Sequence, residues 1–338
     1  MKRAAWQIAA LAGILVLVCA VCRLAGGGAY AAYLPVPANL RDLDAQKLRV
    51  RVSAPEVIDY GAPEVRGGYI RVPIRPRHAG ETDFDIELGR GDAMVLNRFR
   101  VGPFHTVYDF STGGFSGDTV ALAAFTAFCL AVACIMIRVY RRSKGPAFYS
   151  YATIYAAGFS LFALLTGLMM LSVTLRHATR PDRYNMLSAY SSISGAGFSF
   201  MVYTSPFMLA FAVAMGVSNV ALLRHERFRP QNVLGIGVSV MLLAGEALAF
   251  WLFSRDFAGS EWEWRIQNTL QNVYATAFAY FECMLIGAIV CGVKAARHVP
   301  EGDRDYVVIL GCRFRRDGTL PPLLRGRVDR AIEFWRSQ

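Results

Sequence analysis

Two carboxylates stand inside long apolar runs of this sequence, and they are the residues with the clearest potential for chemistry. Glu246 lies about 10 Å from the end of one run and Glu282 about 14 Å from the corresponding end of the next, at about 1.5 Å per helical residue. An ionisable group costs at least about 2.5 kcal/mol in lipid, so such groups usually face a helix bundle or a cavity. Two readings follow: a shared polar site for a proton, a cation or a lipid headgroup, or two protonated carboxyls that are each hydrogen-bonded to a neighbour.

The cysteines and histidines predict no metal site. Six of the seven cysteines lie inside apolar runs, where cysteine behaves as a small hydrophobic residue, and the five histidines are scattered. None of the cysteines falls in residues 30–115, so that segment must fold without a disulfide. The sequence contains no complete catalytic constellation and no evident cofactor site.

A strand–loop–helix pattern follows the last apolar run. Residues 307–310 read as a buried strand, Asp317-Gly318 as a turn, and the segment from Pro321 or Pro322 onward as an amphipathic helix. A hydrophobic strand that feeds a loop and then a helix is how a doubly wound α/β domain begins, with its ligand crevice at the carboxyl end of the strand.

This pattern resembles the opening of the YdcF/SanA/ElyC-like family (domain of unknown function 218) in a multi-helix membrane form. The residues that match are Leu310-Gly311, Asp317-Gly318, Leu324, Arg327 and Ala331. The resemblance implies a Rossmann-like α/β domain that binds a nucleotide-like or phosphorylated ligand, and a link to cell-envelope and peptidoglycan-related processes. Gly311 would allow ligand to approach the strand end, Arg327 would face a phosphate or carboxylate, and Asp317 and Gly318 would form the loop.

The later motifs of that family are not present before Gln338. A doubly wound domain needs further βα units to cover its first strand, and about 35 residues cannot bury an adequate core alone. The expectation is therefore that residues 294–338 hold an incomplete YdcF-like domain, in a chain truncated within it.

The elements that position these residues are predicted from hydropathy. Apolar residues make up 54% of the chain and charged residues 18%, below the roughly 25% charge of soluble proteins. Apolar runs long enough to cross a hydrocarbon core of about 30 Å begin near the N-terminus and recur later, and in lipid they must be helical. They cover residues 4–22, 119–137, 147–175, 193–223, 233–253 and 273–293. In the 193–223 run, Pro206 predicts a kink, with Tyr203, Thr204 and Ser205 available to satisfy the freed carbonyl.

Basic flanks predict the orientation of these helices. Arginine and lysine follow the second, fourth and sixth runs more densely than the intervening loops, which agrees with Lys2 and Arg3 at the start. Both termini are therefore expected in the cytoplasm, and residues 24–118 outside. The first run is either an uncleaved signal anchor, which we favour, or a cleavable signal peptide with a site at 29–31.

The exported segment predicts a small β-sandwich of an immunoglobulin-like kind. Residues 47–53, 69–75 and 83–88 alternate apolar and polar side chains, and Gly- and Pro-rich turns separate them. A sandwich of this kind is commonly a spacer or an interaction module, with an envelope protein or the cell wall as its partner.

The expected architecture is a polytopic α-helical plasma-membrane protein of bacterial type. Its parts are a signal anchor (1–23), an extracytoplasmic β-rich domain (24–118), a five-helix membrane bundle (119–293) and the start of a cytoplasmic α/β domain (294–338). The net charge of +11 is attributed to basic helix flanks and the last residues, so the lipid bilayer and not nucleic acid is the expected partner.

Three functions fit these expectations. The first is a YdcF-like role in envelope or peptidoglycan maintenance. The second is a small-solute or lipid-carrier transporter that uses Glu246 and Glu282. The third is a sensor that couples the exported β-domain to the cytoplasm.

Overall fold

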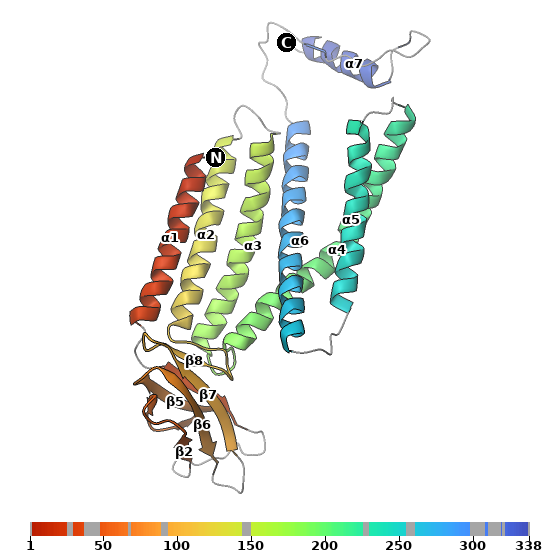
Figure 1. Cartoon of the computed structure of the whole chain (residues 1–338). Helices are drawn as coiled ribbons and strands as arrows, with labels where there is room; N and C mark the ends of the chain where they lie inside the picture. The colour runs from red at the N-terminus through yellow and green to blue at the C-terminus, as the bar shows by residue number, and fades with distance from the viewer. Residues whose placement is uncertain are drawn as a thin grey trace. The chain divides into compact units, whose positions relative to one another are not determined.

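A computed structural model gives the architecture of the chain (Figure 1). It describes residues 2–25, 30–36, 48–66, 69–88, 94–143, 150–225, 230–254 and 261–297, together with 308–309, 319 and 322–336. Two compact units are distinguished, one up to Gly292 and the other from Val293 onward.

Six helices are long and apolar enough to cross a membrane, as expected for a multi-pass membrane protein. These are α1 (Lys2–Ala25), α2 (Asp118–Ser143), α3 (Tyr151–Thr179), α4 (Met186–His225), α5 (Pro230–Ser254) and α6 (Glu261–Ala296). Each agrees with a predicted apolar run. The main difference is that α4 and α6 begin earlier than their runs, because polar residues at their starts continue the helix.

Helices α2 and α3 pack most extensively against one another. Small residues on α3, Ala156 and Ala163, meet Val132, Ala133 and Met136 of α2 in one buried cluster, and Ile8 of α1 packs against it. Buried hydroxyls also bond across this interface, since Thr126 and Thr174 lie 2.9 Å apart. Small side chains and interhelical hydrogen bonds are the usual means of helix association in lipid.

Between α1 and α2 the chain forms two antiparallel sheets, which we call the β-domain. One contains β1 (Tyr30–Pro35), β3 (Ile58–Tyr60), β4 (Glu64–Arg66) and β5 (Tyr69–Pro76), with β5 central. The other has the order β2 (Arg49–Val52), β6 (Gly80–Glu87), β7 (Met94–Val101) and β8 (Val107–Asp109).

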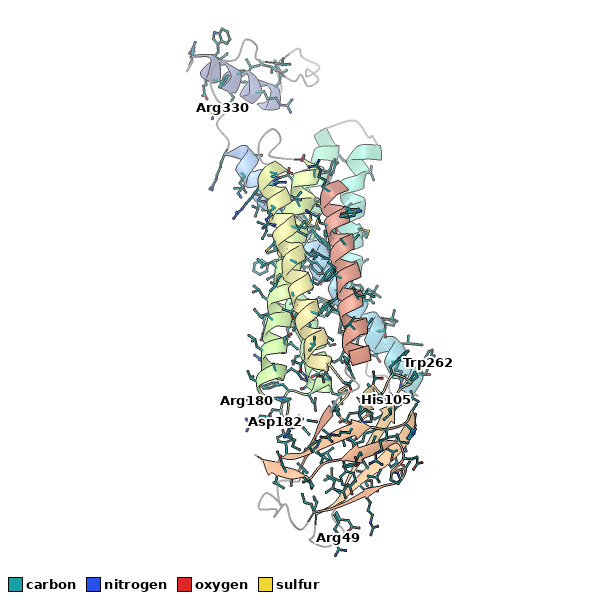
Figure 2. The ribbon with its side chains drawn as sticks, turned by 90° about the vertical axis from the view of Figure 1, so that its left-hand side faces the viewer. Arg49, His105, Arg180, Asp182, Trp262 and Arg330 are labelled. Atoms are coloured by element: carbon teal, nitrogen blue, oxygen red, sulfur yellow. The ribbon has the colours of Figure 1, made fainter. Side chains whose placement is uncertain are left out.

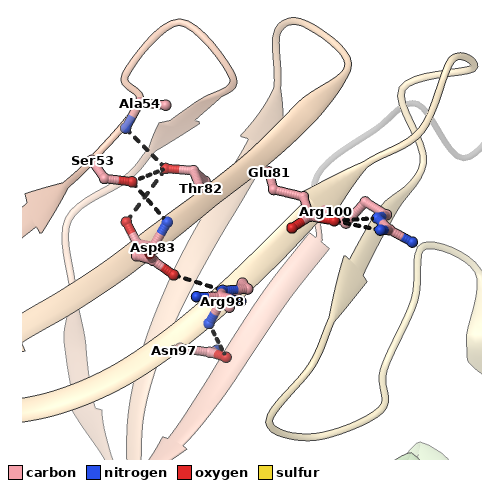
Figure 3. Close-up of polar contacts among 8 residues, drawn as sticks. All are labelled: Ser53, Ala54, Glu81, Thr82, Asp83, Asn97, Arg98 and Arg100. Carbon is pink, nitrogen blue, oxygen red and sulfur yellow. Dashed lines mark hydrogen bonds and ion pairs between the residues drawn. The ribbon is translucent and has the colours of Figure 1, made fainter.

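The inward faces of the two sheets form one core. The predicted apolar positions of β5 and β6 are fully buried, and Phe84 and Phe99 meet edge to face at 5.5 Å between ring centroids. The alternation of these strands is therefore confirmed. On the outward face of the β6–β7 pair, arginines bond to acidic partners on the neighbouring strand, Arg98 to Asp83 and Arg100 to Glu81 (Figure 3).

In the second unit the structure describes helix α7 (Pro322–Arg336), which begins where the sequence predicts a helix. Of the predicted strand 307–310, only Val308 and Ile309 are described; they are exposed and lie in no strand.

Candidate functional site

The candidate site begins with a bend in α4. Pro206 lies inside this helix, where it has no N–H to donate to the carbonyl four residues earlier, and Figure 1 shows α4 changing direction along its length. The hydroxyl of Thr204 bonds to the carbonyls of Phe200 at 2.7 Å and Met201 at 3.3 Å. The expected role of Ser205 in satisfying the freed carbonyl is not observed, because its hydroxyl bonds to a carboxyl group instead.

That carboxyl group belongs to Glu246 of α5. The Ser205 hydroxyl donates to Glu246 Oε2 at 2.6 Å, and only 5% of Glu246 is exposed. The other carboxyl oxygen, Oε1, is buried and has no hydrogen-bond partner among the described residues. A buried oxygen of this kind is costly to leave unsatisfied, so it requires a proton, a water or a ligand.

Glu282 of α6 meets the same segment of α4. Thr204, the residue before Ser205, lies close enough to the Glu282 carboxyl to interact with it as a hydrogen-bond partner, and Glu246 lies close enough to act on it electrostatically. Glu282 is 4% exposed, and its Oε2 also lacks a partner among the described residues. Consecutive residues of α4, Thr204 and Ser205, thus lie beside carboxyls from two different helices, and Ser205 donates a hydrogen bond to one of them.

A cavity of about 190 Å³ adjoins Glu246. Its lining is mainly apolar and aromatic, drawn from α4 and α5: Phe198, Met201, Val202, Ser205, Glu246, Ala249, Phe250, Phe253 and Ser254. Because this environment solvates charge poorly, a negative charge on Glu246 is costly there.

Glu246 is the carboxyl of the pair that lines this cavity. Like charges at short separation repel each other, so ionisation of both carboxyls together is disfavoured. No group of three or more His, Cys, Asp or Glu among the described residues could hold a metal ion.

The structure brings together the two carboxyls that the sequence singled out. Their shared contact with the 204–205 segment of α4 agrees with a common polar site. The contribution of Ser205 was missed, since the sequence suggested only a role in the bend. A polar residue next to an intramembrane proline was the available signal.

The ligand-site residues suggested by the family resemblance cannot be assembled into a site. Gly311, Asp317 and Gly318 lie outside the described residues. Arg327 lies on α7, where it is exposed.

A second polar cluster, unforeseen from the sequence, lies where the β-domain meets the helices. Asp109 is fully buried, and its Oδ1 accepts bonds from the Ser111 N–H and hydroxyl and from the Thr112 N–H. The Tyr30 hydroxyl lies 3.3 Å from Asp109 Oδ2. Burial, reinforced by the Asp109 charge, raises the pKa of Tyr30, so this hydroxyl stays protonated and able to donate.

His177 joins α3 to α2 beside this cluster. Its Nδ1 lies 2.6 Å from the Tyr184 carbonyl oxygen and its Nε2 lies 3.3 Å from Asp118 Oδ1. Both acceptors are satisfied together only when both ring nitrogens carry protons, which is the cationic form of histidine. The contact with Tyr184 holds the turn between α3 and α4, and the contact with Asp118 joins α3 to α2. Both have the character of structural contacts.

Comparisons with family models, curated proteins and solved structures find no match to this chain. The resemblance to the YdcF-like family stays a prediction.

Proposed function

We propose that the membrane bundle is a transporter of a small solute or lipid carrier and that Glu246 and Glu282 are its coupling groups. The observation that carries this proposal is the meeting of both carboxyls with Thr204 and Ser205 at the bend of α4, each with one buried, unpartnered oxygen. Intramembrane carboxyls that face a bundle interior are typical of proton and ion pathways.

The bend offers a means of coupling. Pro206 interrupts the hydrogen-bond ladder of α4 at the level of the two carboxyls, so the two halves of the helix can move relative to one another at low cost. A change in the protonation of Glu246 alters its bond with Ser205, which is adjacent to the interruption. Proton binding and helix movement would be linked through this contact.

Proton movement into proteoliposomes tests the proposal. The full chain is reconstituted with a pH-sensitive dye inside, and a potassium diffusion potential drives protons inward. We expect Glu246→Gln and Glu282→Gln each to slow acidification by at least about tenfold, because each variant removes a proton-accepting group. Glu263→Gln provides the control, since Glu263 is an exposed carboxyl on α6. Wild-type rates in both test variants would refute the proposal.

We propose as a second function a YdcF-like role, in which this plasma-membrane protein takes part in maintenance of the cell envelope and peptidoglycan. Support comes from the ordered motif between residues 306 and 331 and from α7, which carries Arg327 on an exposed position. A Rossmann-like domain that binds a nucleotide-like or phosphorylated ligand belongs to this proposal, with Gly311, Asp317, Gly318 and Arg327 as ligand-site residues.

The second function is tested in cells that carry the altered chromosomal gene. Arg327→Ala should increase sensitivity to detergent and to cell-wall antibiotics, because it removes the proposed partner of a phosphate or carboxylate. Arg330→Ala is the matched control, since Arg330 is an exposed arginine of the same helix that pairs with Glu333 at 2.8 Å. Equal sensitivity of the two variants, or none, would count against the ligand site.

A sensor that couples the β-domain to the cytoplasm is a third proposal. Two contacts support it: the Leu187 N–H of α4 donates to the Thr112 carbonyl beside the Asp109 cluster at 2.9 Å, and His177 of α3 pairs with Asp118 at the start of α2. The proposal includes an extracytoplasmic location for residues 24–118, cytoplasmic termini, an immunoglobulin-like class for the β-domain and an envelope or cell-wall partner for residues 30–115.

A further inference from the structure

A groove of about 730 Å³ lies between the β-domain and the turn that joins α3 to α4. Its lining combines aromatic rings with arginines, and consists of Tyr33, Tyr69, Arg71, Ala178, Thr179, Arg180, Pro181, Asp182 and Arg183. The transporter and YdcF-like functions proposed above use none of these residues.

Strand register explains how the β-domain contributes to the groove. Tyr33 of β1 lies directly opposite Arg71 of β5, and Tyr69 lies two residues before Arg71 on the same face. Their neighbours Ala32, Leu34 and Ile70 are buried in the core, so alternation turns the tyrosines and the arginine outward. The outward face of this sheet therefore presents two hydroxyl-bearing rings and a guanidinium group.

The α3–α4 turn contributes the other wall. Residues 180–185 connect two membrane-crossing helices, which places them at the membrane surface. Arg180 and Arg183 are both exposed there, and Figure 2 labels Arg180 and Asp182 at this turn. Headgroups of the adjacent leaflet occupy this level of the membrane.

The groove has an excess of positive charge. Three arginines and one acidic residue line it. Arg71 donates a hydrogen bond to Glu64 Oε2 at 3.1 Å and another to the Tyr33 hydroxyl oxygen, and these bonds raise the pKa of Arg71 and hold its guanidinium group in place. Arg180 and Arg183 form no ion pair with any other residue that the structure describes. By contrast, Arg71 in the groove pairs with Glu64, and four other arginines of the β-domain also pair with acidic partners: Arg51, Arg77, Arg98 and Arg100.

We propose that this groove binds the phosphate of an anionic lipid headgroup in the leaflet on the β-domain side. Guanidinium groups match the geometry of phosphate oxygens and can bind them bidentately. Tyrosine suits the same level of a membrane because its ring is apolar and its hydroxyl is polar. Asp182 would disfavour ligands that carry further negative charges beyond the phosphate, because its carboxylate repels them.

Lipid binding to the full chain is measured by native mass spectrometry in a neutral detergent. Phosphatidylglycerol and phosphatidylcholine are titrated separately, and the Kd of the first bound lipid is compared. We expect wild-type protein to prefer phosphatidylglycerol by about tenfold or more, because both lipids carry the phosphate but the choline group adds a positive charge that the arginines repel. The double variant Arg180→Gln, Arg183→Gln should lose this preference.

Two further variants separate the groove from general charge and from misfolding. Arg98→Gln with Arg100→Gln removes the same charge from paired positions on the other sheet (Figure 3) and should keep the preference. Arg180→Lys with Arg183→Lys should retain part of it, which a folding defect would not do. The proposal is overturned if the Arg180→Gln, Arg183→Gln variant keeps the preference for phosphatidylglycerol, or if the Arg98→Gln, Arg100→Gln control loses as much of it.

A soluble competitor distinguishes a lipid from a free phosphate compound. Glycerol phosphate is added at the lipid concentration that half-saturates the protein. Weak or no displacement of phosphatidylglycerol supports a lipid ligand, because the acyl chains hold the headgroup at the groove. If glycerol phosphate binds as tightly as the lipid, the lipid assignment is overturned and the groove is a site for a soluble phosphate ester.

Discussion

At the scale of single residues, the buried carboxyl groups differ in how completely they are bonded. Asp109 in the β-domain accepts bonds at both oxygens from donors close in sequence and from Tyr30. Glu246 and Glu282 each retain a buried oxygen without a partner among the described residues. A saturated group fits a structural role, whereas an unsatisfied one suggests that a proton or ligand is still to be bound.

Asp109→Ala should destabilise the β-domain. The change leaves the N–H groups of Ser111 and of buried Thr112 without their acceptor, at a cost of about 1–3 kcal/mol. Limited proteolysis of the purified full chain across a temperature series would detect this as a lower midpoint for cleavage between α1 and α2. Asp85→Ala in β6 is the control, because Asp85 is only partly buried. Equal midpoints for the two variants would contradict the structural role of Asp109.

At the scale of elements, α3 and α6 approach so closely that their backbones touch at two glycines. A Cβ at Gly158 would lie 2.6 Å from the Cα of Met284, and one at Gly287 would lie 2.6 Å from the Gly158 backbone nitrogen. Glycine at such positions permits close helix contact in lipid. This contact lies on the helix that carries Glu282, so it helps to set the position of that carboxyl.

Gly158→Ala should therefore loosen the bundle. The methyl group has only backbone and the Met284 sulfur to displace, and we expect a loss of about 1–3 kcal/mol of stability, typical of overpacking. Thermal unfolding in detergent measures it. Gly195→Ala in α4 serves as the comparison, since a Cβ there meets nothing within 4 Å and alanine favours a helix. A stable Gly158→Ala variant would show that α3 and α6 can separate without cost.

The elements themselves were largely predictable and their contacts were not. Alternation in β5 and β6 and the long apolar runs are local patterns, which the chain expresses whatever its tertiary partners are. Five strands lie outside the three predicted runs: β1, β3, β4, β7 and β8. Tyr30–Pro35, for example, shows no such alternation, and its pairing with β5 makes it a strand. The bond from Ser205 to Glu246 joins residues 41 positions apart, and only helix packing determines it.

At the scale of the whole molecule, the proposed orientation can be tested with single cysteines. In a cysteine-free background, Leu96→Cys places a thiol at an exposed position of β7, and Ile332→Cys places one at an exposed position of α7. An impermeant maleimide added to intact spheroplasts should label the first, and should label the second only after permeabilisation. The charge bias of the helix flanks is the physical basis for this expectation. Labelling in the opposite order would reverse the orientation.

The connection from the β-domain to α2 limits where this chain can accept insertions and deletions. Residues 110–117 connect β8 to α2, and the Ser116 N–H near their end still bonds to the Val107 carbonyl of β8 at 3.0 Å, two residues before α2 begins at Asp118. Each residue inserted into the first turn of α2 would rotate the domain by about 100° and displace it by about 1.5 Å along the axis. An insertion or deletion there would change the orientation of the β-domain relative to the membrane. The loops of the β-domain tolerate changes of length far better.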